Sequence, residues 1–198
     1  MLKKINLVVF DFDGTLSAFD SNAQFIKYCF SHSLRPWFFL PLMIFLSPMK
    51  YINPGGIWWR ELLRMFLTND MIKKLVPGFI KQHKMNRFGW AAERVAAERS
   101  AGNKVILISA GPEYLIKKLV SDIKFDAVIA SEYEKSHPWK FKSFVWGANK
   151  VVAMDRWAKE NKFIPKLLRS YSDSKTDLPI MMLANEQVWI DRKTGCRK

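Results

Sequence analysis

The stretch Ile5-Asn6-Leu7-Val8-Val9-Phe10-Asp11-Phe12-Asp13-Gly14-Thr15-Leu16 decides how the rest of the chain is interpreted. Its apolar run at 7–10 carries no charge, which is typical of a strand buried on both faces of a parallel sheet. The run ends on Asp11, and a second carboxylate follows at Asp13, before a glycine that permits a sharp turn. Because open α/β sheets bind ligands at the carboxyl ends of their strands, the stretch predicts a functional site directly after the first strand. An ordinary acidic turn is the alternative, since Asp and Gly are common turn residues.

Further short apolar runs repeat this strand pattern along the chain. They lie at 105–108, 127–130, 167–171 and, more weakly, 188–190. Stretches with helical spacing or helix-end signals lie between them, at 91–100, 112–120 and 149–161. The alternation of strand and helix predicts an α/β fold, built on a Rossmann-like parallel sheet of about five strands.

Two segments do not fit this alternation. Residues 17–87 separate the first two predicted strands and are helical in pattern, aromatic and very apolar, and they are too long for a loop. We therefore expect a core domain, 1–16 and 88–198, with a helical cap domain, 17–87, inserted after the first strand. Residues 131–146 form a second, smaller insert with a break at His137-Pro138, which predicts a β-hairpin flap. The flap is rich in aromatic residues: Tyr133, Trp139, Phe141, Phe144 and Trp146.

A second acidic motif follows the predicted strand at 167–171. Asp173 and Asp177 lie four positions apart, again where a strand reaches its carboxyl end. Acidic residues gathered at one rim of a sheet are costly unless a cation neutralises them. Hard oxygen ligands without a nearby His or Cys favour Mg²⁺ over zinc.

The order of these motifs carries a family resemblance. Asp11-x-Asp13-Gly14-Thr15, Ser109 at the end of the second strand, Lys150 opening a late helix and Asp173-x-x-x-Asp177 resemble the four motifs of the haloacid dehalogenase superfamily. The resemblance covers nearly the whole chain. It implies that Asp11 attacks phosphorus and forms an aspartyl-phosphate. Asp13 would protonate the leaving oxygen and later deprotonate water, which points to phosphoryl transfer.

The resemblance also implies how the metal is bound. Mg²⁺ would be held by the Asp11 carboxylate, the Asp13 backbone carbonyl and Asp173. Asp177 would orient either the metal shell or Lys150.

The phosphoryl oxygens would be bound by Ser109 and by the backbone N–H groups of Ala110 and Gly111, with Lys150 offsetting their charge. Taken alone, Ser109 would be an ordinary turn or helix N-cap residue and Lys150 a solvated lysine.

Two groups within the superfamily suggest different substrates. The helical cap is similar to that of the phosphoserine phosphatase branch, but Asp20 stands where that branch usually carries a Glu that reads the substrate amine. The chain is also similar to the bacterial phosphatidylglycerophosphatase C group, which shares the Pro-rich apolar cap stretch, Gly147-x-x-Lys150 and the Tyr171-Ser172-Asp173-Ser174 form of the last motif. The substrate is therefore expected to be a phosphate monoester, either a small molecule or a lipid phosphate such as phosphatidylglycerophosphate.

The apolar part of the cap, residues 36–59, has Lys50 as its only charged residue. It is interrupted by Pro41 and Pro48, and its uncharged run at 36–49 is shorter than the ~20 residues that span a bilayer. A buried cap helix is one interpretation. The other is an interfacial segment in peripheral contact with a membrane, flanked by basic residues. Those residues are Arg35, Lys50, Arg60 and Arg64.

Composition narrows the remaining classes. The 198 residues are 49% hydrophobic, which excludes disorder of the whole chain, and the two cysteines, Cys29 and Cys196, exclude a disulfide scaffold and a zinc ribbon. The first residues do not form a signal peptide, so we expect a cytoplasmic location, with the inner face of the cytoplasmic membrane as an alternative.

The chain is strongly basic. With 32 Lys+Arg against 18 Asp+Glu, the formal net charge is +14, a value that would suit nucleic acid or an anionic membrane. No nucleic-acid-binding motif is present, so no nucleic-acid partner is expected, and a solvated basic face is the simpler interpretation. A non-catalytic basic binding module is the competing class of function. The sequence does not indicate an oligomeric state.

Overall fold

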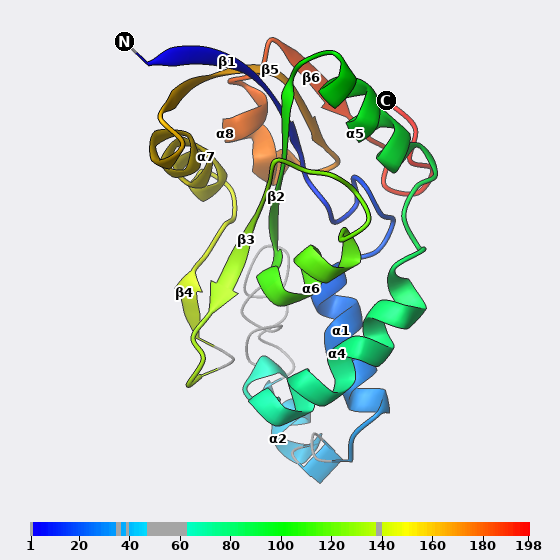
Figure 1. Cartoon of the computed structure of the whole chain (residues 1–198). Helices are drawn as coiled ribbons and strands as arrows, with labels where there is room; N and C mark the ends of the chain where they lie inside the picture. Colours follow the sequence, from blue (N-terminus) through cyan, green and yellow to red (C-terminus); the bar gives the residue numbers. More distant parts are fainter. Residues whose placement is uncertain (1, 35–36, 39, 47–62, 138–139) are drawn as a thin grey trace.

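The strands form a single sheet in the order β4-β3-β2-β1-β5-β6 (Figure 1). This computed structural model describes residues 2–34, 37–38, 40–46, 63–137 and 140–198. The strands are β1 (Lys3–Phe10), β2 (Lys104–Pro112), β3 (Ala127–Tyr133), β4 (Phe141–Ser143), β5 (Phe163–Ser172) and β6 (Glu186–Trp189). All neighbouring strands are parallel except β3 and β4. The predicted Rossmann-like sheet of five parallel strands is confirmed.

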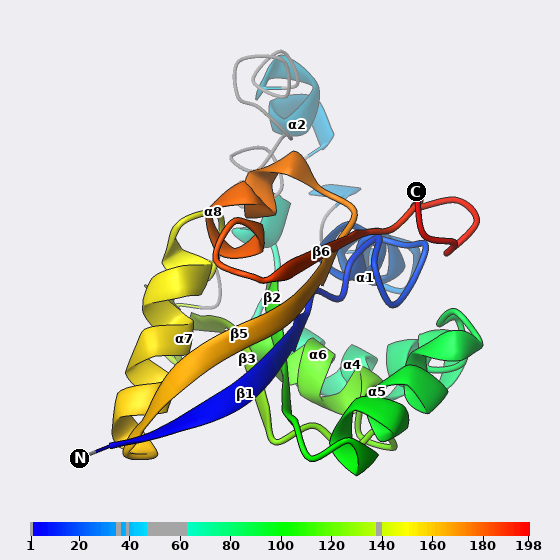
Figure 2. The ribbon, with the colours of Figure 1, turned by 90° about the horizontal axis from the view of Figure 1, so that it is seen from above.

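Helices cover both faces of the sheet. The structure contains α1 (Ser21–Ser31), α2 (Leu40–Leu46), α4 (Asn69–His83), α5 (Trp90–Ser100), α6 (Glu113–Leu119), α7 (Asn149–Glu160), the 3-10 turn η4 (Lys175–Asp177) and α8 (Leu178–Met181). Figure 2 shows α7 and α8 on one face of the sheet, with α5 and α6 on the other. Helices α1, α2 and α4 extend beyond the carboxyl ends of the strands, and α2 lies farthest from the sheet (Figure 1).

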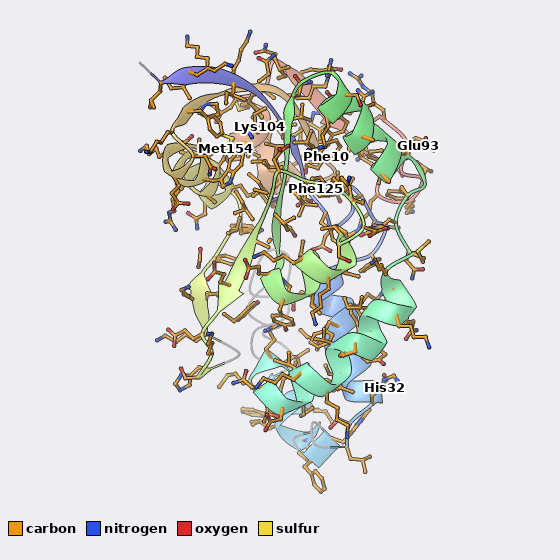
Figure 3. All side chains as sticks on the ribbon, viewed as in Figure 1. Phe10, His32, Glu93, Lys104, Phe125 and Met154 are labelled. Carbon is orange, nitrogen blue, oxygen red and sulfur yellow. The ribbon has the colours of Figure 1, made fainter. Side chains whose placement is uncertain are left out.

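Alternation of side chains along β1 builds a core on each face. Leu7 and Val9 pack in the cluster that includes Met154 of α7, whereas Val8 and Phe10 pack in the cluster that includes α1, α4, α5 and α6. Figure 3 shows Phe10 and Phe125 close together in the core, and their ring centroids are 6.3 Å apart. Burial on both faces explains why the strand is a continuous apolar run in the sequence.

The predicted flap is a hairpin. Strand β4 pairs antiparallel with the end of β3, with Tyr133 opposite Phe141 and Glu132 opposite Ser143. The rings of Tyr133 and Phe141 lie 4.6 Å apart, and Phe144 continues this aromatic row at 4.4 Å from Phe141. Trp139, also predicted in the flap, lies outside the described residues.

The two ends of the segment 17–87 lie side by side next to the sheet. Ser17 and Arg87 form an antiparallel bridge, and the N–H of Phe88 donates to the carbonyl of Leu16 at 2.9 Å. The segment between these residues contains α1, α2 and α4. Its helices pack through aromatic contacts such as Phe25 of α1 against Phe79 of α4, with ring centroids 5.2 Å apart.

The apolar surface around α2 consists of Trp37, Phe38, Leu42, Ile44 and Phe45. These side chains are exposed, Phe38 to 83% and Phe45 to 79%. The described part of the segment 36–59 is therefore not a buried helix, and the rest of it lies outside the described residues. Within the described ranges, no helix combines the length and the apolar character needed to cross a membrane.

Candidate active site

A pocket of about 160 Å³ lies where β1, β2 and β5 reach their carboxyl ends. These three strands are neighbours in the sheet, so Asp11 after β1, Gly111 in β2 and Asp173 after β5 converge there. Of the nine site residues that the sequence predicts, eight line this pocket: Asp11, Asp13, Asp20, Ala110, Gly111, Lys150, Asp173 and Asp177. Ser109 is the exception.

Lys150, in the first turn of α7, joins the two acidic motifs. Its Nζ donates to Asp11 Oδ1 at 2.8 Å and to Asp177 Oδ2 at 2.7 Å, and the hydroxyl of Ser172 donates to the same Asp177 oxygen at 2.7 Å. Burial lowers the pKa of Lys150, but the attraction of Asp11 and Asp177 outweighs it, and the net shift of this pKa is upward. The side chain therefore stays charged. Of the two roles predicted for Asp177, its contacts match the orientation of Lys150.

Asp11 is a buried carboxylate beside this cation. Burial raises the pKa of Asp11 to about 7, against the opposing attraction of Lys150. The sequence does not indicate the role of Thr15, which belongs to the first motif. Its hydroxyl lies 3.5 Å from Asp11 Oδ2 and 3.5 Å from Asp173 Oδ1, and it accepts the backbone N–H of Asp173 at 3.0 Å. Thr15 therefore positions the two motifs against each other.

Gly14 is required by this arrangement for two reasons. Its φ of +82° lies in the left-handed region that favours glycine. A Cβ at this position would also overlap the carboxylate of Asp173. The glycine thus allows the loop after β1 and the end of β5 to approach closely.

Asp13 is held by the start of α1. The backbone N–H of Ser21 donates to Asp13 Oδ1 at 2.6 Å, and the Ser21 hydroxyl donates to Oδ2 at 3.0 Å. Burial raises the pKa of Asp13 to about 8, and the nearby charges of Asp20 and Asp11 add to the shift. The raised pKa favours the protonated form of Asp13, which is the form that can donate a proton.

Asp20 caps α1 and also lines the pocket. Its Oδ1 accepts the backbone N–H of Ala23 at 2.8 Å, the usual contact of an N-cap aspartate. The helix cap alone accounts for an Asp at this position, so a role in substrate binding stays a prediction.

Ser109 is fully buried and does not line the pocket, although the next two residues, Ala110 and Gly111, do. Its hydroxyl accepts the backbone N–H of Gly111 at 3.0 Å and so fixes the turn at the end of β2. A direct contact between Ser109 and a phosphoryl group stays a prediction.

The expectation that Arg64 flanks an interfacial segment is wrong. Its side chain is fully buried, and it donates from Nη1 to Asn22 Oδ1 and from Nη2 to the hydroxyl of Tyr114, both at 2.9 Å. The guanidinium carbon also lies 3.8 Å from the ring centroid of Tyr133. Because the guanidinium is buried and has its hydrogen-bond partners inside the protein, Arg64 does not face a lipid headgroup.

Sequence reasoning missed two other parts of the pocket. Arg192, after β6, lines it, as do the flap residues Phe141, Phe144 and Trp146. The sequence shows the flap aromatics as a cluster but does not connect them to the site. No sequence signal separated Arg192 from the other basic residues.

The residues at the strand ends fit a Mg²⁺ site in which the protein supplies only a few of the ligands. In the described part of the chain, no group of three or more His, Cys, Asp or Glu side chains could hold a metal ion. The predicted set has only two carboxylates, Asp11 and Asp173, together with the backbone carbonyl of Asp13. The close approach that Gly14 allows brings Asp173 to the loop that carries the other two ligands. Mg²⁺ is typically held by one or two carboxylates and keeps several waters, so this donor set is adequate.

Comparison with known proteins identifies the class. Residues 8–182 match the haloacid dehalogenase-like hydrolases, and the chain belongs to this family. A histidinol-phosphatase of Neisseria meningitidis is 22% identical over 94% of this chain and 90% of its own length. A Bordetella pertussis protein of unknown function has a similar fold, with a TM-score of 0.76, 15% identity and coverage of 95% and 91% of the two chains. A phosphoserine phosphatase solved as a phospho-aspartyl intermediate analogue has a TM-score of 0.65, at 16% identity and coverage of 95% and 87%.

Proposed function

We propose that the chain is a Mg²⁺-dependent phosphatase that hydrolyses a phosphate monoester through an aspartyl-phosphate on Asp11. The observation that carries this proposal is the placement of Lys150 between Asp11 and Asp177 at the floor of the pocket, with Asp13 beside them. The names of the relatives support it, since a histidinol-phosphatase and a phospho-aspartyl analogue of phosphoserine phosphatase are among them.

The positions of these groups support a reaction in two steps. A carboxylate oxygen of Asp11 attacks phosphorus while the bond from phosphorus to the ester oxygen breaks, and Asp13 gives its proton to that leaving oxygen. In the second half, Asp13 takes a proton from the water that attacks phosphorus, and the Asp11 carboxylate is released. Lys150 offsets charge on the phosphoryl oxygens throughout. Bound Mg²⁺ supplies further neutralisation of the negative charge that Asp11, Asp173 and the phosphate bring together.

We further propose that residues 17–87 act as a cap domain over this pocket, with 1–16 and 88–198 as the core. The bridge between Ser17 and Arg87 supports these boundaries, because it holds the two ends of the segment together. Asp20 and Asn22 reach the pocket from this segment, so a cap could contribute to substrate selection.

A lipid phosphate is the second candidate substrate, and the apolar surface around α2 favours it. Phe38, Ile44 and Phe45 are at least 64% exposed, and α2 lies at the far end of the molecule from the sheet (Figure 1). Insertion of such side chains into a membrane surface would hold the protein against the lipid that carries the phosphate. A small phosphate ester that diffuses in water is the alternative, as the names of the two phosphatase relatives suggest.

Asp11→Asn tests the mechanism. The variant should release no phosphate from p-nitrophenyl phosphate with Mg²⁺, because an amide cannot act as the nucleophile. Removal of Mg²⁺ with EDTA should abolish the activity of the wild type. Asp155→Asn, on the exposed face of α7, is the matched control and should keep wild-type activity. Turnover by Asp11→Asn comparable with that of the control would refute the proposed mechanism. A panel of phosphoserine, histidinol phosphate and phosphatidylglycerophosphate in detergent would then separate the candidate substrates.

A further inference from the structure

The C-terminal segment brings Arg192 to the mouth of the pocket. This residue lies beyond residues 8–182, the part that matches the family, so the family match does not account for it. The segment continues from β6 at one edge of the sheet, where the N–H of Ile190 donates to the carbonyl of Ser172 at 2.9 Å. Arg192 then reaches the pocket that the neighbouring strand ends form.

The turn that carries Arg192 is held firmly. Asp191 Oδ1 accepts the backbone N–H groups of Lys193 and Thr194, each at 2.9 Å, and the N–H of Gly195 donates to the Asp191 carbonyl at 2.8 Å. The indole of Trp90 donates to the carbonyl of Gly195 at 2.8 Å, which ties the turn to α5. The position of Arg192 is therefore set by the fold of this turn.

The guanidinium of Arg192 has spare hydrogen-bonding capacity. Its Nε donates to the carbonyl of Ala18 at 3.4 Å, and its Nη1 lies 4.0 Å from Asp173 Oδ2, too far for a hydrogen bond. With respect to the described residues, neither Nη atom makes a hydrogen bond, and the side chain is 48% exposed. An arginine carries five N–H donors, so the four on the two Nη atoms can donate to a ligand. Lys150, the other cation of the pocket, is already bound by Asp11 and Asp177.

The size of the pocket places part of the substrate beside this residue. At about 160 Å³ it is smaller than the ~300–1,000 Å³ of typical ligand sites, so it holds the phosphoryl group and the atoms next to it. The rest of the alcohol must lie at the mouth. Among the lining residues, Arg192 is 48% exposed and comes from the β6 side of the sheet, whereas Phe144 and Trp146 come from the β4 side.

We propose that Arg192 binds a second anionic group, a carboxylate or a phosphodiester, on the alcohol part of the substrate. The inference rests on the proposed phosphatase function and narrows its substrate class to phosphate monoesters whose alcohol carries another negative charge. A planar guanidinium binds either oxyanion through two parallel N–H bonds. Esters of purely cationic alcohols, such as phosphoethanolamine, are disfavoured because their charge would face this side chain.

The test measures how Arg192→Gln changes substrate preference. The readout is kcat/KM for a substrate with a second anion divided by kcat/KM for p-nitrophenyl phosphate. 3-Phosphoglycerate supplies the carboxylate, and phosphatidylglycerophosphate in detergent supplies the lipid phosphodiester, so the two sources are compared directly. The ratio should fall at least tenfold for one of them, mainly through KM, and Arg192→Lys should restore part of it. Arg197→Gln is the matched control, because Arg197 pairs with Glu186 in the same segment and does not line the pocket.

Each remaining outcome overturns the inference. An unchanged ratio for both anionic substrates would mean that Arg192 does not bind an anionic group on the alcohol part of the substrate. An equal loss on all substrates, p-nitrophenyl phosphate included, would mean that the residue acts only through Asp173. If wild-type protein hydrolyses none of the substrates, the proposed function itself fails and the inference fails with it, whereas activity on p-nitrophenyl phosphate with an unchanged ratio removes the inference alone.

Discussion

The pocket at the strand ends and the apolar surface around α2 differ in whether their side chains have partners within the protein. In the pocket, the buried charges of Lys150, Asp11 and Asp177 are all paired within the protein. Around α2, large apolar side chains such as Phe38 and Phe45 face solvent. Removing one partner of a buried ion pair leaves an unpaired buried charge and destabilises the fold. Exposed apolar side chains add little to the fold and matter mainly for binding to another surface. The two regions should therefore respond differently to mutation, in stability as well as in activity.

The largest effect is expected from Lys150→Met. Removal of the cation leaves the carboxylates of Asp11 and Asp177 buried without their partner, which should destabilise the fold by about 3–5 kcal/mol. Phosphatase activity should fall by two to three orders of magnitude, roughly the effect of losing a stabilising group in an active site. Urea unfolding and hydrolysis of p-nitrophenyl phosphate measure the two effects. Lys159→Met, exposed on the same helix, should change neither, and equal stability of the two variants would contradict the buried ion pair.

Gly14→Ala should disrupt the pocket through the backbone. Any residue with a Cβ at φ +82° adopts an unfavourable conformation, at a cost of roughly 1–2 kcal/mol. Gly102 provides a matched control because its φ is +81° and a Cβ there would meet nothing within 4 Å. Gly102→Ala should show the conformational cost alone, whereas Gly14→Ala should unfold more easily and bind Mg²⁺ more weakly, since its methyl group displaces Asp173. The same loss of stability in both variants, with unchanged Mg²⁺ affinity, would remove the role assigned to this close approach.

Asp173→Asn should act mainly on the metal. Replacing residues that only support metal ligands lowers affinity by about 10–100-fold, so loss of a direct ligand should weaken Mg²⁺ binding at least tenfold. Calorimetric titration with Mg²⁺ measures this change. The preference between two substrates should change much less, because Asp173 is assigned to the cation and not to the leaving group. Wild-type Mg²⁺ affinity in the variant would show that the acidic rim has another purpose.

The contrast between the two regions also explains what the sequence could predict. Asp11 and Asp173 are far apart in the chain, but both follow neighbouring parallel strands whose carboxyl ends lie together, so their positions after the strands were enough to predict that they meet. Lys150, at the start of α7, was placed with them by the family resemblance alone. Arg64 was misjudged because an arginine beside an apolar segment resembles a membrane-flanking residue. Its actual partners, Asn22, Tyr114 and Tyr133, come from three other elements, and no local pattern indicates them. The approach of Arg192 likewise depends on the turn after β6.

Phe38→Ser combined with Phe45→Ser should have the smallest effect on the fold and the most selective effect on function. Because both side chains are about four-fifths exposed, their replacement should change the free energy of unfolding by no more than about 0.5 kcal/mol per site. Hydrolysis of p-nitrophenyl phosphate should stay near the wild-type value. If α2 contacts lipid, binding to vesicles of anionic phospholipid should weaken several-fold, together with hydrolysis of a long-chain lipid phosphate. Met85→Ser provides the control, since Met85 is 80% exposed at the turn after α4, outside this surface. Equal vesicle binding by the wild type, the double variant and the control would exclude a membrane role for α2, and the substrate would then be a small phosphate ester in water.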